Sequence, residues 1–179
     1  MPTQQSLSSS SNRTRWRSYR RVPSIQLSRQ WRHWLLDQGS LTARLIKLSN
    51  NNFHVEVAFQ GWGKPTLSEA RALNIHPRQQ VLIREVRLFG HGVPWVYARS
   101  VIPAPTLNGP LRMLKSLGSR PLGALLFKEP TMRRGPIETA LIPIGAEKQQ
   151  TWARRSVFFM RAKPLLVTEI FLQPLQRVQ

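Results

Sequence analysis

The chain has 179 residues and no cysteine, and its 27 lysine and arginine residues outnumber 8 aspartate and glutamate residues, a formal net charge of +19. This length suits one domain with a single sizeable core, and the absence of cysteine excludes disulfide bonds, a thiolate nucleophile and cysteine–zinc sites. No apolar run approaches the roughly 20 residues of a membrane span, and no signal-peptide core follows the N-terminus, so we expect a soluble protein.

A large positive charge attracts nucleic acids, anionic membrane surfaces or anionic small molecules. The excess is spread along the chain without a lysine-rich block, and no recognition helix, zinc-finger spacing or aromatic-basic RNA-binding signature is found. We therefore interpret the charge as a field that attracts anions and expect no specific nucleic-acid partner. A peripheral contact between the basic surface and an anionic membrane stays open.

The start of the chain is polar and basic. Residues 1–15 consist largely of Ser, Gln, Thr, Asn and Arg, which bury too little apolar surface to fold alone. We expect residues 1–19 to form a disordered or loosely ordered basic arm and residues 20–179 to form one domain. The acid-free start also resembles an organelle transit peptide, but it is short and lacks an amphipathic pattern.

Two helices are predicted after this arm. The first covers residues 28–39, with Ser28 as N-cap, Gly39 just past its end, and an apolar stripe at helical spacing formed by Trp31, Trp34 and Leu35. The second is shorter, with Ser40 or Thr42 as its cap, and carries on one face Leu41, Leu45 and Leu48.

A half-buried strand is predicted over Phe53–Gln60, where apolar and polar residues alternate. The aromatic and aliphatic residues share one face, which places Gln60 on the polar face. A loop follows, and Thr66 and Glu69 then match a capping box that opens a short helix.

The stretch Val81–Pro103 is predicted to form a β-hairpin around a loop of several residues at Gly90–Pro94. Side chains two residues apart share a face, so Arg84 lies on the more apolar face of its strand and Arg99 has large apolar neighbours on its own. A guanidinium stays protonated and is not buried without an acceptor. Each arginine therefore meets an internal carboxylate or an anionic ligand, or it leans out to solvent on its aliphatic stem.

The remaining elements complete an α+β domain, an antiparallel β-sheet with flanking short helices. A helical face is expected over residues 111–117 and an apolar turn or helix over residues 121–127. Strands are expected over Thr131–Pro143, Trp152–Arg161 and Leu165–Leu172. Neither face of the last strand is polar, so it is predicted to be central, and its Glu169 has the strongest claim to burial among the carboxylates.

Common catalytic motifs are missing from the sequence. The four histidines are scattered without metal-site spacing, and there is no GxSxG elbow, GxGxxG loop or P-loop. Arg84, Glu169 and, with less support, Arg99 stand out on apolar strand faces. They form either a structural buried ion pair or a closed apolar cavity with a cationic end for a carboxylate.

In its short motifs, the sequence resembles the chorismate pyruvate-lyase family, the chorismate lyases of ubiquinone biosynthesis. The resemblance covers roughly residues 20–174 and keeps the order of the family's motifs. The segments that carry it are Trp34–Leu36, Gly39–Thr42, Leu82–Val86, Gly92–Trp95, Ala98–Pro103, Leu107–Pro110, Leu117–Gly118, Arg120–Gly123, Leu126–Phe127, Trp152–Ser156 and Lys163–Leu172.

This resemblance implies a chorismate lyase-like fold with an internal ligand cavity, and conversion of chorismate to 4-hydroxybenzoate and pyruvate by a cytoplasmic monomer without metal or organic cofactor. It implies that Arg84 binds the ring carboxylate, helped by the backbone N–H groups of Leu41 and Leu122. Glu169 is expected to meet the 4-oxygen, and Arg99 the enolpyruvyl carboxylate. Leu41 stands where the family pattern has Met, which a backbone contact tolerates; the long N-terminus and the basic excess also depart from the pattern.

Two other functions stay open on the sequence. A non-catalytic ligand-binding module of the same fold, sensing a small carboxylate, would need a DNA-binding domain, for which residues 1–27 are too short. A nucleic-acid-binding protein is suggested by the net charge alone.

Overall fold

The computed structural model describes residues 14–19 and 27–178, and residues 1–13, 20–26 and 179 lie outside this description. One antiparallel sheet of eight strands runs through it in the order β1-β6-β7-β8-β4-β3-β2, with β5 paired to β7. The strands are β1 (Arg17–Ser18), β2 (Phe53–Gly63), β3 (Val81–Gly90), β4 (Val93–Pro103), β5 (Arg133–Arg134), β6 (Glu138–Ile144), β7 (Gln149–Met160) and β8 (Lys163–Phe171). The predicted α+β architecture is confirmed.

The helices are short, and side-chain caps mark the start of three of them. They are α1 (Arg29–Leu35), α2 (Leu41–Leu48), α3 (Leu67–Leu73), α4 (Leu122–Leu126), α5 (Gln173–Gln176) and the 3₁₀ helices η5 (Ala104–Thr106) and η6 (Gly109–Ser116). Ser28 and Ser40 cap α1 and α2, and Thr66 and Glu69 form the predicted capping box of α3. In the described part of the chain, none of the helices is long and apolar enough to cross a membrane.

The first helix ends at Leu35, earlier than the predicted end next to Gly39. Asp37 Oδ1 accepts a hydrogen bond from the N–H of Gly39 at 2.8 Å. This local side-chain contact offers the backbone an alternative to the helical hydrogen-bond pattern.

Of the predicted basic arm, the structure describes only residues 14–19. The predicted domain boundary at residues 19 and 20 lies next to residues 20–26, which are outside the described part of the chain. In the described part, Arg17 and Ser18 pair with β6, and Trp16 packs against the apolar cluster around Ala153 and Ile170. Residues 14–19 therefore lie against the sheet.

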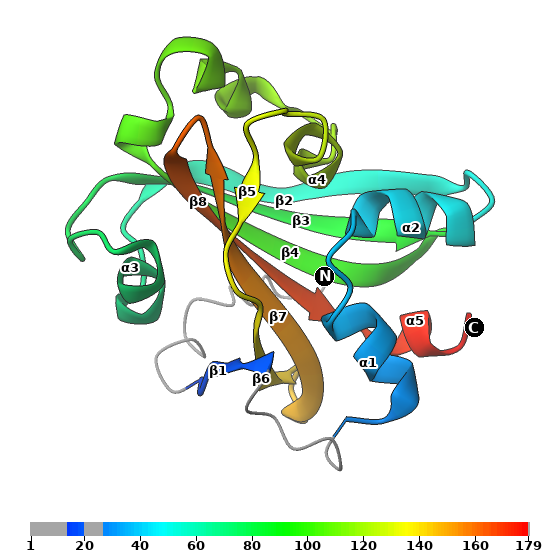
Figure 1. Ribbon diagram of the computed structural model, residues 1–179. Coiled ribbons are helices and arrows are strands. Elements are labelled where there is room, and N and C mark those ends of the chain that lie inside the picture. Colours follow the sequence, from blue (N-terminus) through cyan, green and yellow to red (C-terminus); the bar gives the residue numbers. More distant parts are fainter. Residues whose placement is uncertain (1–13, 20–26, 179) are drawn as a thin grey trace.

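Helices cover one face of the sheet in two groups, and we call this the covered face. The first group is α1 and α2, whose Trp34, Leu35 and Leu45 pack against strand residues such as Phe171. The second is η6 and α4, whose leucines pack against Leu82, Ile102, Phe158 and Leu165. The opposite face, the far face, packs against α3. In Figure 1, α2 lies in front of β2 and β3, α4 lies near β2, and β5 crosses in front of the sheet beside α4.

The β3–β4 hairpin places its two arginines on opposite faces of the sheet. Arg84 is paired with Ser100, and the adjacent pair is Glu85 with Arg99, so side-chain alternation separates the two guanidinium groups. The connecting turn is tighter than predicted: only His91 and Gly92 separate the strands, and both have positive φ, 52° and 74°. Two-residue hairpin turns require this backbone geometry.

A β-bulge in β2 changes which residues lie on the covered face of the sheet. In β2, Val57 pairs with Val86 and Phe59 with Glu85, so Ala58 is the extra residue. The predicted alternation therefore holds to Val57 and then reverses, which puts Gln60 on the covered face opposite Arg84. The prediction of one unbroken alternation to Gln60 was wrong, because a bulge leaves no periodic signal in a short apolar run.

The predicted strand Thr131–Pro143 is two strands, β5 and β6. Gly135 and Pro136 separate them, and proline cannot donate a hydrogen bond to a neighbouring strand. The interruption lets Arg134 reach over the covered face while β6 continues along β7.

The second bulge fixes a close contact at the end of the hairpin. Trp95 is the extra residue of β4, and its buried indole lies against Gly90 at the end of β3. A Cβ atom built on Gly90 would lie 2.2 Å from two ring carbons of Trp95. The indole of Trp95 therefore fits in this position only because residue 90 has no side chain.

Replacing Gly90 by Ala is expected to lower the free energy of unfolding by about 3 kcal/mol through this overpacking. Gly92→Ala is the matched control, because Gly92 has a φ of +74° but open space around its Cβ position; only backbone strain of about 1 kcal/mol is expected there. Urea denaturation of both variants measures the difference. Equal losses would contradict the steric explanation.

Candidate functional site

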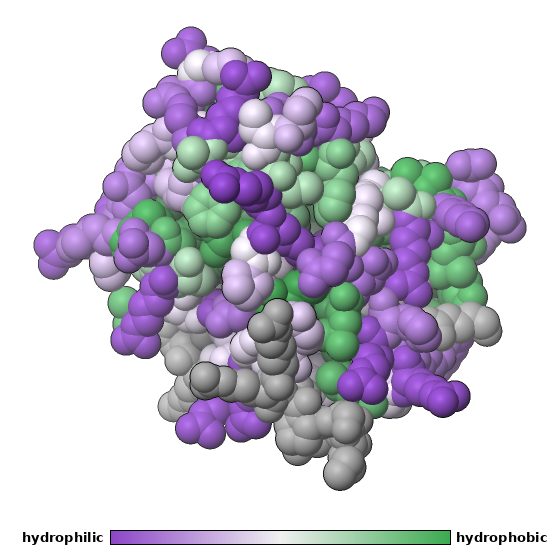
Figure 2. Space-filling model, viewed as in Figure 1, coloured by the Kyte–Doolittle hydropathy of each residue, from purple (hydrophilic) through white to green (hydrophobic). Residues whose placement is uncertain are grey.

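A cavity lies on the covered face between the two helix groups. The space between its lining residues is about 570 Å³, a volume that includes solvent at its mouth. Its lining comes from α2, β3, β4, α4, β5, β7 and β8 and includes Leu41, Thr42, Arg84, Val86, Ala98, Ser100, Leu122, Arg134, Arg154, Phe158, Val167 and Glu169. Figure 2 shows hydrophobic surface in the middle of this face, next to a hydrophilic band where β5 lies, with further hydrophilic side chains around it.

Arg84 is the buried cation of this cavity, with 2% of its surface exposed. Its Nη1 donates to Gln60 Oε1 and its Nη2 donates to the backbone oxygen of Arg120, both at 3.1 Å. Both acceptors are neutral, and among the described residues no carboxylate lies within ion-pair distance of Arg84. Burial lowers its pKa. A guanidinium that has lost water without gaining a counter-ion provides a binding site for an anionic ligand.

Gln60 was missed by the sequence analysis because the bulge in β2 turns it toward Arg84. Its Oε1 accepts from Arg84, and its Nε2 donates to the backbone oxygen of Lys115 in η6 at 2.8 Å. The amide therefore links the edge strand, the buried arginine and the helix group that closes this end of the cavity.

Glu169 on β8 lies across from Arg154 on the neighbouring strand β7. Arg154 Nε donates to Glu169 Oε2 at 2.5 Å, and Arg154 Nη1 donates to the backbone oxygens of Trp34 and Asp37 at 2.7 and 2.8 Å. The Arg154 side chain is 1% exposed and that of Glu169 is 16% exposed. These contacts fix the carboxylate and leave its Oε1 without a protein partner among the described residues.

Arg134 on β5 is the second cation of the cavity without a carboxylate partner among the described residues. Its Nε donates to Ser156 Oγ at 3.0 Å and its Nη1 donates to the backbone oxygen of Asp37 at 3.3 Å. Its guanidinium carbon lies 5.0 Å from the ring centre of Phe158. Burial, and next the positive charge of Arg154, lower the pKa of Arg134 to about 10, against the smaller effects of Glu169 and Asp37.

Leu41 and Leu122 begin α2 and α4, and both line the cavity. The first N–H groups of a helix have no acceptor within it, so these two helix starts can donate to a ligand. The helices approach closely here: a Cβ atom on Gly123 would lie 2.7 Å from Thr42 Oγ1. The absence of a side chain at Gly123 thus brings the two helix starts together over the cavity.

Arg99 does not belong to this cavity, and the expectation that it joins Arg84 there is corrected. It lies on the far face, where its Nε and Nη2 donate to Glu69 and its Nη1 donates to Glu85. Burial alone would lower the pKa of Arg99, but hydrogen bonds and charges of both carboxylates raise it. Its carboxylate partners escaped prediction because Glu69 was assigned only to the helix cap and Glu85 was not assigned a role.

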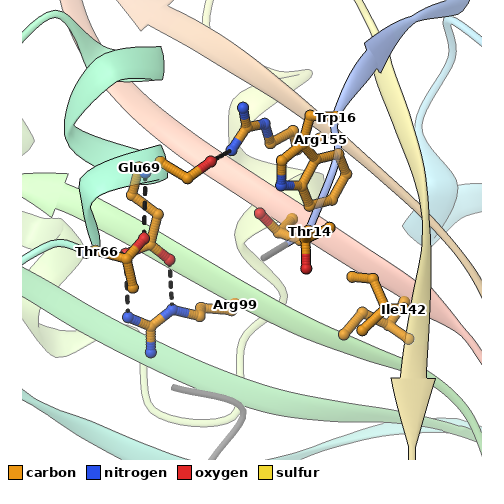
Figure 3. A pocket seen from close by; sticks show the side chains of 10 residues that line it. Thr14, Trp16, Thr66, Glu69, Arg99, Ile142 and Arg155 are labelled. Atoms are coloured by element: carbon orange, nitrogen blue, oxygen red, sulfur yellow. Dashed lines mark hydrogen bonds and ion pairs between the residues drawn. The ribbon is translucent and has the colours of Figure 1, made fainter. Parts of the chain in front are cut away.

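Figure 3 shows the far-face pocket around Arg99, with Glu69 against the guanidinium and Trp16 beside Arg155. Arg155 donates to Glu138 and to Ser68. Both arginines of this pocket are therefore compensated by carboxylates, whereas Arg84 and Arg134 on the covered face are not.

The sequence-predicted residues Arg84, Glu169, Leu41 and Leu122 thus line one cavity, and Arg99 lies elsewhere.

Comparison with known proteins gives the family context. A family model described as chorismate lyase matches residues 11–178. A protein of Marinobacter nauticus named "Probable chorismate pyruvate-lyase" is 46% identical over 141 residues, covering 79% of this chain and 75% of that protein. A protein of Pseudomonas aeruginosa with the same name is 42% identical over 147 residues, covering 79% of this chain and 83% of that protein.

Solved structures show the same fold at much lower identity. The C-terminal domain of a histidine utilization repressor from Pseudomonas syringae pv. tomato matches with a TM-score of 0.53 and 14% identity, covering 68% of this chain and 92% of that chain. This likeness concerns the fold alone.

The two faces of the sheet predict opposite responses to the loss of an arginine. Arg84→Met is expected to leave the melting temperature unchanged or raise it, because an uncompensated buried charge is removed. Arg99→Met is expected to cost about 3–5 kcal/mol, because it leaves Glu69 and Glu85 buried without their cation. Thermal and urea unfolding of the ligand-free variants measure both effects. A similar loss in Arg84→Met would show that Arg84 is a structural residue.

Proposed function

The chain belongs to the chorismate lyase family, and we propose that it converts chorismate to 4-hydroxybenzoate and pyruvate, an early step in supplying the ubiquinone ring. The observation that carries this proposal is the cavity itself: an unpaired buried guanidinium at Arg84 and a fixed carboxylate at Glu169, with apolar side chains between. A flat ring with a carboxylate at one end and an oxygen at the other matches that arrangement.

Arg84 binds the ring carboxylate in this proposal. A carboxylate accepts charge-assisted hydrogen bonds from guanidinium N–H groups, and the neutral acceptors Gln60 and Arg120 already hold the group in place. The N–H groups of Leu41 and Leu122, at the starts of α2 and α4, supply further donors to the same carboxylate. The contacts come from rigid elements on both sides of the cavity, so they orient the ring as well as bind it.

Glu169 meets the 4-oxygen of the substrate. Arg154 occupies Oε2, and the other carboxylate oxygen is available to accept a hydrogen bond from the 4-hydroxyl group. Two roles remain in the proposal: the carboxylate assists removal of the hydrogen from the adjoining ring carbon, or it orients the ring while this hydrogen passes to the enolpyruvyl group.

The reaction balances without water, an oxidant or a reductant. The bond between a ring carbon and the ether oxygen breaks, the ring carbon bearing the hydroxyl loses its hydrogen, and the ring becomes aromatic. The released enolpyruvate takes up a proton at its methylene carbon and becomes pyruvate. Aromatisation supplies the driving force, so orientation and charge placement suffice and no cofactor is invoked.

The proposal includes a monomeric enzyme in the cytoplasm, with chorismate and 4-hydroxybenzoate as its small-molecule partners. One chain supplies every side chain named in the cavity, so a second subunit is not needed to build the site. The lack of cysteine suits a reducing compartment.

Purified protein is expected to convert chorismate to 4-hydroxybenzoate, followed by the product's absorbance, and Arg84→Ala is expected to lower kcat/KM by about 10²- to 10³-fold. This is the range for truncating one member of a buried charge pair. The matched control is Arg87→Ala on the same strand, because Arg87 forms an exposed ion pair with Glu56. No turnover by the unmodified protein would refute the function, and equal turnover in Arg84→Ala would refute the role of Arg84.

Glu169→Gln keeps the side-chain shape but weakens the charged contact, so kcat is expected to fall at least about tenfold. Glu138→Gln is the control, because Glu138 pairs with Arg155 on the far face much as Glu169 pairs with Arg154. Steady-state kinetics and melting temperatures are measured together. If Glu169→Gln only lowers the melting temperature, Glu169 is a structural partner of Arg154.

A further inference from the structure

Four of the residues that line the cavity are charged. Arg84, Arg134 and Arg154 are cations and Glu169 is an anion. The ion pair between Arg154 and Glu169 cancels one charge of each sign. The free cavity therefore carries two uncompensated positive charges, at Arg84 and Arg134. Such a cavity is complementary to a dianion, and the proposed substrate has two carboxylates.

Arg134 is placed to donate to a ligand. Ser156 and the backbone oxygen of Asp37 use its Nε and Nη1 and hold the guanidinium over the covered face. Its Nη2 has no hydrogen-bond acceptor among the residues that the structure describes. The ring of Phe158 lies against the guanidinium and reduces its contact with water. Arg84 reaches the cavity from β3, and Arg134 reaches it from β5, which pairs with β7. Since β8 and β4 lie between β7 and β3, the two cations come from opposite sides of the cavity.

We propose that Arg134 binds the enolpyruvyl carboxylate of the substrate, so that the dianion is held between two guanidinium groups. This inference rests on the proposed function and assigns to Arg134 the contact that the sequence analysis expected of Arg99. Glu69 and Glu85 already occupy Arg99 on the far face.

The electrostatics of the free cavity favour this contact. Burial and the neighbouring charge of Arg154 both disfavour the charged form of Arg134 and lower its pKa to about 10. An anionic group beside Arg134 opposes both effects, because it supplies the missing counter-charge. Substrate binding thus relieves a cost that the ligand-free protein bears.

The inference separates substrate from product. Chorismate carries both carboxylates, whereas 4-hydroxybenzoate retains only the ring carboxylate, which Arg84 binds. Loss of Arg134 must therefore weaken chorismate binding far more than product binding. Loss of Arg84 must weaken both.

The test compares Arg134→Gln with Arg133→Gln, its neighbour on β5, whose side chain is exposed. In Arg134→Gln, KM for chorismate is expected to rise about 10- to 100-fold while the inhibition constant of 4-hydroxybenzoate changes less than about threefold. Arg133→Gln makes the same change in net charge and is expected to alter neither constant. Arg134→Lys keeps the charge but loses the paired donors, and its KM should lie between those of Arg134→Gln and the unmodified protein.

A rise of KM and of the inhibition constant by the same factor would overturn the inference, because it would show that Arg134 only maintains the cavity. An unchanged KM would also overturn it. Circular dichroism checks folding, and if Arg134→Gln is unfolded, the ratio of the two constants in Arg134→Lys decides by the same criterion. Turnover by the unmodified protein distinguishes these results from failure of the proposed function, which would abolish 4-hydroxybenzoate formation altogether.

Discussion

A guanidinium buried on one face of the sheet, without a carboxylate to neutralise it, is the constraint around which the cavity is built. Arg84 is 2% exposed and contacts two neutral oxygens. Burying such a charge lowers the stability of the ligand-free protein, so packing elsewhere in the structure must offset this cost. The two apolar clusters beside the cavity do this, because α1 and α2 pack on one side and η6 and α4 on the other. The chain thereby holds an open, charged space between two well-packed regions.

The sequence predicted the parts of this arrangement that depend on regular alternation. Arg84 and Glu169 were placed on buried strand faces because their neighbours two residues away are apolar, and the structure puts both in one cavity. Alternation fails at an extra residue, so the bulge at Ala58 hid Gln60. Arg134 was hidden for a related reason: a single expected strand is interrupted at Gly135 and Pro136, and no local pattern shows where the freed side chain goes. Arg99 was misplaced because its carboxylates come from α3 and β3, a tertiary contact that residue spacing does not encode.

The fold alone does not decide between catalysis and ligand sensing. A regulator domain with 14% identity has the same overall architecture, so the sheet and its helices suit either use. What distinguishes this chain is which charges face the cavity and which of them are already neutralised. Arg99 and Arg155 on the far face have carboxylate partners and act as structural ion pairs. Arg84 and Arg134 on the covered face lack such partners in the described chain, and in the proposed function they bind the two carboxylates of the substrate.

Arg154 explains how a carboxylate can share this cavity with unpaired arginines. In a space of low dielectric constant, a free Glu169 would be drawn to Arg84 or Arg134, and that ion pair would occupy the donors that the substrate needs. Arg154 prevents this because it lies directly across from Glu169 on the next strand and is anchored by the backbone oxygens of Trp34 and Asp37. The pair holds the carboxylate on β7 and β8, away from β3. The Arg154–Glu169 ion pair therefore leaves Arg84 and Arg134 available to a ligand. The positive charge of the cavity results from the pairing of β7 with β8, which places Arg154 beside Glu169.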